Sequence, residues 1–183
     1  MGTQLAGVTD AQLREGLIAC LHVQRWADEV VAAGPYSSVD ALVEAARDAA
    51  TPLSAAEVDE AMAQHPRIGE RPTGTGQSTS FSRAEQASSA SGDEELAARL
   101  AAGNAAYEAR FGRVFLIRAA GRSREEILGE LERRLGLDPE EEIGIVGSEL
   151  RDIALLRIPQ VFTYLDAVAL DHSAGLDDAD AAR

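Results

Sequence analysis

The chain has 183 residues, of which 45% are apolar and 4% aromatic, and its formal net charge at pH 7 is −14. A length of this order suits one domain with a substantial core. Because Ala, Leu, Val and Ile supply that core with few aromatic residues, packed helices are favoured over a sandwich or barrel. The acidic excess disfavours a nucleic-acid partner, since the chain would repel a phosphate backbone. With Cys20 as its single cysteine, the chain has no internal disulfide.

The ends of the chain lack strong patterns. We expect a flexible N-terminus over residues 1–8, one helical domain over residues 9–172 and a disordered polar tail over residues 173–183. The start lacks the basic and apolar stretches of a signal peptide, and no apolar run approaches the length of a membrane span. A cytoplasmic protein without a membrane partner is the simplest interpretation.

Four helices are expected in the first third of the chain. Their markers are, in chain order, Thr9 as the first N-cap, the apolar residues Trp26, Val30 and Val31 of a short second helix, Ser38 as the start of the third, and the S-x-x-E capping box of Ser54 and Glu57. The fourth helix should end at His65, because Pro66 disfavours the α conformation in the residue before it.

The middle of the chain is interrupted by a polar stretch. Residues 69–80 are rich in Gly, Pro and hydroxyl side chains and lack apolar periodicity, which predicts a loop. Helix should resume near Ser82 and again over residues 93–111, where Gly112 is placed to end it. The apolar run 114–117 fits either a lone strand or a buried extended segment, because periodicity cannot decide between them.

Two further helices complete the pattern. Ser123 caps the first, and Pro139 begins the last, since proline suits the first helical position. The inner face of the last helix is expected to consist of Ile143, Val146, Leu150, Ile153, Leu156 and Ile158. Pro159 should kink or break this helix before residues 161–170. The predicted fold class is therefore all-α, a single-domain bundle of roughly seven or eight helices.

The strongest candidate site combines His65 with the segment from Ser82 to Gln86. A histidine at a helix C-terminus is often only favourable to the helix dipole. Ser82 and Glu85 have the spacing of a second capping box, a structural role that is compatible with an anion site at a helix N-terminus. An imidazole, a carboxylate and neutral hydrogen-bonding groups in one small site would suit proton transfer.

Arg157 lies on an otherwise apolar stretch, so its guanidinium needs a partner. The partner is either a carboxylate of the protein, in a structural salt bridge, or a carboxylate or ureido oxygen of a substrate. A metal site is not indicated, because His22, His65 and His172 are too scattered along the chain. The sequence also lacks a P-loop, a dinucleotide-binding fingerprint and a G-x-S-x-G nucleophile elbow.

Four ordered motifs resemble one family, the OHCU (2-oxo-4-hydroxy-4-carboxy-5-ureidoimidazoline) decarboxylases of urate breakdown, over roughly residues 10–170. They are His65-Pro66-x-Ile68-Gly69, Ser82-x-x-Glu85-Gln86, Asn104-x-x-Tyr107-Glu108-x-Arg110-Phe111-Gly112 and Phe115-Leu-Ile-Arg-Ala. The resemblance implies an all-α homodimer that uses no cofactor. It also implies a small-molecule substrate, a ureidoimidazoline, which is converted to (S)-allantoin and CO2.

The resemblance also implies the site residues. The family's catalytic histidine falls on His65, and its second key residue falls on Glu85. The substrate-binding residues that it implies are Pro66, Ser82, Arg83, Ala84, Gln86, Ile117, Arg118, Ala119, Ala120 and Gly121. Arg157 is added to these residues because it lies on an apolar stretch of the sequence, and not because of the resemblance. Many members have Asp after the His-Pro pair, so Arg67 is not carried over.

Two other kinds of function fit parts of the pattern. A hydrolase or lyase that acts on a related ureido compound would use the same His65 and Glu85, and would release urea or ammonia in place of CO2. A helical interaction module without chemistry would leave these residues as helix caps. Such a module should expose an apolar stripe on one of its helices.

Overall fold

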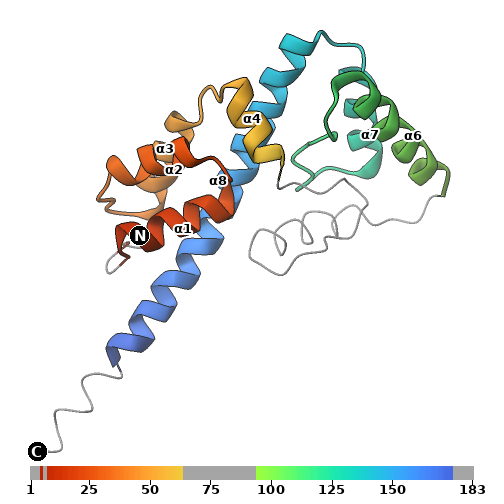
Figure 1. Ribbon diagram of the computed structural model, residues 1–183. Coiled ribbons are helices and arrows are strands. Elements are labelled where there is room, and N and C mark those ends of the chain that lie inside the picture. Colours follow the sequence, from red (N-terminus) through yellow and green to blue (C-terminus); the bar gives the residue numbers. More distant parts are fainter. Residues whose placement is uncertain (1–4, 6–7, 64–93, 175–183) are drawn as a thin grey trace, which may run out of the picture. The chain divides into compact units, whose positions relative to one another are not determined.

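The computed structural model describes residue 5, residues 8–63 and residues 94–174, with side chains described as far as Phe162. Within these ranges there are seven α-helices and no strands (Figure 1), which confirms the all-α fold class. The apolar run at residues 114–117 is a buried or partly buried extended segment, the second of its two expected conformations. The helix expected near Ser82 lies outside the described residues.

The chain divides into two compact units. The first unit contains α1 (Asp10–Cys20), α2 (Gln24–Ala32), α3 (Val39–Ala49) and the part of α8 (Pro139–Ala174) that begins at Ala154. The second unit, Pro52–Ile153, contains α4 (Ala55–Met62), α6 (Glu94–Phe111), α7 (Arg124–Arg134) and the first part of α8. One long helix therefore contributes to both units.

The helices begin where the capping signals in the sequence predict. Four capping side chains accept a hydrogen bond from a backbone amide of the first turn: Thr9, Ser38, Ser54 and Ser123. Three of them form reciprocal capping boxes, Thr9 with Gln12, Ser54 with Glu57 and Ser123 with Glu126. Each such cap contributes about 1 kcal/mol to helix stability, so local chemistry fixes these helix starts.

The first unit packs around Trp26 of α2. Its side chain is fully buried, and its indole Nε1 donates a hydrogen bond to the Ala46 carbonyl of α3 at 2.8 Å. On α1, a Cβ built at Gly16 would lie only 2.9 Å from Cζ of Phe162 on α8 and 3.0 Å from Cγ1 of Val161. The missing side chain at Gly16 therefore lets α1 and this part of α8 approach closely.

The last helix departs from the sequence prediction in two ways. It continues through Pro159 to Ala174, so of the two predicted effects of this proline the break is wrong, and the kink stays a prediction. Ile158 and Val161 are buried on either side of the proline, and this packing offsets the hydrogen bond that the ring removes. Leu156 is 42% exposed rather than part of the inner face. Among the side chains that the structure describes it is the one large apolar group that is exposed, so these side chains form no apolar stripe.

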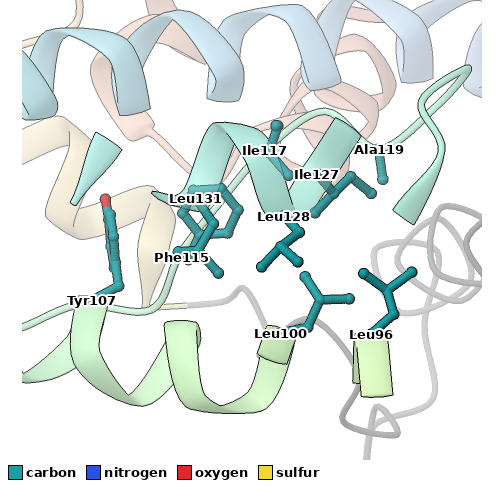
Figure 2. Close-up of a cluster of buried hydrophobic side chains, with 9 residues drawn as sticks. All are labelled: Leu96, Leu100, Tyr107, Phe115, Ile117, Ala119, Ile127, Leu128 and Leu131. Atoms are coloured by element: carbon teal, nitrogen blue, oxygen red, sulfur yellow. The ribbon is translucent and has the colours of Figure 1, made fainter. Parts of the chain in front are cut away.

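The core of the second unit lies between α6, α7 and the chain that joins them (Figure 2). Its nine buried residues are Leu96, Leu100, Tyr107, Phe115, Ile117, Ala119, Ile127, Leu128 and Leu131. Phe115, Ile117 and Ala119 alternate along extended backbone, so one face of this segment packs into the core. The segment that the family resemblance assigns to substrate binding is thus anchored by apolar packing.

No helix in the described part of the chain is long and apolar enough to span a membrane.

The contact between α6 and α7 depends on Gly103. A Cβ built there would lie 2.6 Å from Cδ2 and 3.2 Å from Cγ of the fully buried Leu131. We expect Gly103→Ala to be about 1–3 kcal/mol less stable than Gly129→Ala, because overpacking destabilises a core. Gly129 of α7 has open space around its Cβ position, so its substitution carries the same gain in helix propensity without a clash. Urea denaturation of the two variants would measure this difference, and equal stabilities would contradict the prediction.

Candidate active site

The described residues contain two parts of the predicted site, the segment from Ile117 to Gly121 in the second unit and Arg157 in the first. The predicted catalytic residues His65 and Glu85 lie outside the described residues. The predicted binding residues Pro66, Ser82, Arg83, Ala84 and Gln86 lie outside them as well. The roles of these seven residues stay predictions.

The segment from Ile117 to Gly121 is extended backbone that ends in a turn. Ile117 and Ala119 are buried, Arg118 and Ala120 are partly buried, and Gly121 is exposed. The Arg122 amide donates to the Ala119 carbonyl at 3.0 Å, and Gly121 has a φ of 81°. A positive φ at the third position of a turn is a conformation that favours glycine. The turn therefore has a defined shape directly before α7 begins.

Glu149 of α8 contacts the residue before this turn and the side chain of its last residue. Its Oε2 accepts a hydrogen bond from the Arg118 amide at 2.7 Å, and its Oε1 lies 3.5 Å from Nη1 of Arg122. The side chain of Glu149 is 14% exposed and that of Arg122 is 28% exposed, so the surroundings partly shield both interactions from water. A hydrogen bond from an amide to a carboxylate is stronger than one between neutral groups. Glu149 thus links the backbone just before the turn to α8.

A second carboxylate, that of Glu142, is fully buried, and through Arg134 it contacts the chain before the turn. It accepts hydrogen bonds from Arg134 of α7, with Nε to Oε1 at 3.0 Å, and from the Tyr107 hydroxyl of α6. Arg134 also donates through Nη1 to the Leu116 carbonyl at 2.8 Å, and its guanidinium carbon lies 4.8 Å from the centre of the Phe115 ring. Burial raises the pKa of Tyr107, and the hydrogen bond to Glu142 adds to this effect, so the phenol keeps its proton and donates it.

Arg134, Glu142 and Glu149 were not predicted as site residues from the sequence. Glu142 stands in an acidic first turn and Arg134 in the last turn of its helix, and both placements have a sufficient local explanation in the helix dipole. The one signal for joint action is that Glu142 and Glu149 are separated by about two helical turns, which puts them on one face of α8. Only the tertiary contacts show which groups this face of α8 binds.

Arg157 of α8 is buried, as expected from its apolar setting, with 3% of its surface exposed. Its Nη1 donates to the Cys20 carbonyl at the end of α1 at 3.2 Å, where a helix leaves carbonyls without an intrahelical partner. Arg157 therefore has a structural role in the first unit, and its contact with a substrate stays a prediction. Burial raises the pKa of the Cys20 thiol to about 12, so this cysteine is a protonated core residue at neutral pH.

Comparison with known proteins places the chain in a family. The family model of OHCU decarboxylase matches residues 7–159. The chain is 29% identical over 155 residues to the uric acid degradation bifunctional protein TTL of Arabidopsis thaliana, covering 79% of this chain and 45% of that protein. It is 36% identical over 102 residues to the 2-oxo-4-hydroxy-4-carboxy-5-ureidoimidazoline decarboxylase of Amia calva, covering 53% and 57%. The matches thus span about half the length of these curated relatives.

Solved structures support the same assignment. A crystal structure of OHCU decarboxylase in the presence of (S)-allantoin matches with a TM-score of 0.67 at 27% identity, covering 82% of this chain and 98% of that one. A crystal structure of (S)-allantoin synthase matches with a TM-score of 0.62 at 16% identity, covering 87% and 54%, and supports the fold alone. Because the family model covers most of the sequence, from before α1 to Pro159, the chain belongs to the OHCU decarboxylase family.

Proposed function

We propose that this chain catalyses the cofactor-independent decarboxylation of 2-oxo-4-hydroxy-4-carboxy-5-ureidoimidazoline to (S)-allantoin and CO2 in urate breakdown. The observation that carries the proposal is the family match over residues 7–159. The likeness to a decarboxylase structure obtained in the presence of (S)-allantoin, which extends over 98% of that chain, supports it.

The chemistry needs no external electron sink, because the substrate carries one. When the carboxylate leaves as CO2, the electron pair of the broken bond spreads into the adjacent ring C=N bond. The ring nitrogen of that bond, which now carries the electron pair, takes up a proton from water. The hydroxyl then loses its proton and the neighbouring carbon gains one, which gives the ring carbonyl and the stereocentre of (S)-allantoin. The protein has to hold the carboxylate out of the ring plane and to protonate one face, and such orientation contributes several kcal/mol.

In this mechanism His65 is the proton donor, and Glu85 orients it or accepts the hydroxyl proton. A neighbouring carboxylate favours the protonated form of an imidazole, which is the form that donates. Ser82, Gln86 and the backbone from Ile117 to Ala119 hydrogen-bond the ureido group and the ring amides. These roles follow from the family motifs at the same positions of this sequence.

Arg157 is assigned to a ring or ureido oxygen rather than to the substrate carboxylate. A tight pair between Arg and the carboxylate would stabilise the substrate more than the neutral CO2 being formed, and would therefore slow the reaction. The bond of the buried guanidinium to the Cys20 carbonyl accounts for its structural role in the first unit. The assignment to substrate rests on the setting of Arg157 in the sequence alone.

The proposed activity is tested by circular dichroism of the product. We expect the purified chain, added to freshly generated substrate, to produce the signal of (S)-allantoin faster than the unaided reaction. Unaided decay gives racemic allantoin, so the sign and growth of the signal, and not the loss of substrate, are diagnostic. A silent trace with slow racemic product would contradict the proposal. Release of urea or ammonia would favour the ureido hydrolase.

A further inference from the structure

Two carboxylates of α8 hold the chain at the start of the predicted substrate-binding backbone. Glu142 acts through Arg134, whose Nη1 lies 2.8 Å from the Leu116 carbonyl. Glu149 acts directly on the Arg118 amide at 2.7 Å. Because the two carboxylates lie on one face of the helix, the backbone between Leu116 and Arg118 is held at both ends by one rigid element.

We infer that Glu149 is a positioning residue for substrate binding. The inference rests on the proposed function, in which the backbone from Ile117 to Ala119 hydrogen-bonds the substrate. Glu149 sets the direction of these backbone groups through its bond to the Arg118 amide, and it need not touch the substrate. Small displacements of groups that position a substrate lower its productive binding.

The contacts favour this role over that of a surface ion pair. The interaction of Glu149 with Arg122 is long, at 3.5 Å, and partly exposed, so it contributes little by itself. The bond to the Arg118 amide is short and charge-assisted. It holds the residue before a turn that contains a positive φ at Gly121, a conformation that most residues disfavour. The carboxylate is therefore placed to fix backbone geometry.

The test compares Glu149→Ala with Glu149→Gln in the circular dichroism assay. Glu149→Ala removes the acceptor of the Arg118 amide, and we expect it to raise KM about tenfold with a smaller change in kcat. Glu149→Gln keeps an oxygen that can accept from the same amide, and it should restore most of the lost affinity. A role limited to charge or to general stability would not produce this rescue together with a change confined to KM.

A pair of glycine substitutions tests the same turn without touching Glu149. Gly121 and Gly112 both have a positive φ, 81° and 68°, and both have open space at the Cβ position. Alanine imposes the same kind of backbone strain at either site. Gly121→Ala should raise KM as Glu149→Ala does, whereas Gly112→Ala, at the end of α6, should leave KM unchanged. If Glu149→Ala fails to fold, an unchanged KM in Gly121→Ala would still overturn the inference, because the turn next to the Glu149 contact would then not matter for binding.

The outcomes separate this inference from the proposed function. A wild-type chain that forms no (S)-allantoin would overturn both. An active wild type with an unchanged KM in Glu149→Ala and Gly121→Ala would overturn the positioning role alone. The same conclusion would follow if Glu149→Gln were as impaired as Glu149→Ala, or if Gly112→Ala raised KM as much as Gly121→Ala.

Discussion

Replacing His65 by Asn should lower the rate of (S)-allantoin formation by about 10²- to 10⁴-fold while the helical fold is retained. Asparagine keeps a polar side chain of similar reach, but it cannot carry and release the proton that the product carbon requires. The measurement is the initial growth of the (S)-allantoin dichroism signal at saturating substrate. Far-UV circular dichroism of the same sample checks the helix content.

His22→Asn is the matched control for this prediction. It makes the same chemical change at a partly buried histidine just after α1, and the rate should stay close to that of the wild type. If the folded His65→Asn protein turned over at a similar rate, His65 would have no part in the reaction. Its position before Pro66 would then be explained by the end of a helix alone.

Glu85→Gln separates catalysis from capping at the second key position. In a capping box Gln serves in place of Glu, so a structural Glu85 would tolerate the change. An amide cannot accept the substrate proton, and we therefore expect a loss of rate comparable to that of His65→Asn. The control is Glu57→Gln in the capping box at the start of α4, where the Ser54 amide donates to Glu57 at 2.8 Å. Full activity in Glu85→Gln would reduce Glu85 to a cap.

Helix starts were predictable from sequence because their causes are local. Thr9, Ser54 and Ser123 each bond an amide within their own first turn, and neither tertiary packing nor a partner is needed to recognise that pattern. The conformation of the apolar run at residues 114–117 was not predictable from sequence, for the opposite reason. Its backbone shape depends on the core of α6 and α7, into which Phe115 and Ile117 pack.

The course of α8 shows where local rules fail. Proline in a helix interior removes a hydrogen bond, which predicts a kink or a break at Pro159, yet the buried side chains around it keep the helix continuous. The inner face was predicted correctly at Val146 and Leu150 but not at Leu156, which is exposed. Apolar spacing alone could not show which residues of so long a helix would find a packing partner.

The candidate site was predictable only in part. The family motifs pointed to the segment from Ile117 to Gly121, but the groups that hold it, Arg134, Glu142 and Glu149, come from other helices. Charged residues at helix ends are common and normally solvated, so nothing in the sequence distinguishes the buried Glu142 from the neighbouring acidic residues of the same turn. Tertiary packing decides which carboxylate is buried.

Glu142→Ala is the substitution for which we expect the largest loss of stability, about 3–5 kcal/mol in the free energy of unfolding. The carboxylate is 1% exposed and accepts hydrogen bonds from the fully buried Arg134 and from Tyr107. Its removal leaves the Arg134 charge in an apolar interior, with the Leu116 carbonyl as its remaining partner in this cluster. Urea denaturation followed by far-UV circular dichroism would measure the change.

Two control variants test the cause of the stability loss expected in Glu142→Ala. Glu132→Ala removes a carboxylate from the exposed pair with Arg99, at 2.8 Å, and should change stability by about 0–1 kcal/mol because water screens that pair. Combining Glu142→Leu with Arg134→Met removes both buried charges and should recover much of the stability lost in Glu142→Ala. If Glu142→Ala were no less stable than Glu132→Ala, the buried pair would not support the backbone at Leu116. If the double variant were as unstable as Glu142→Ala, the unpaired charge would not be the cause.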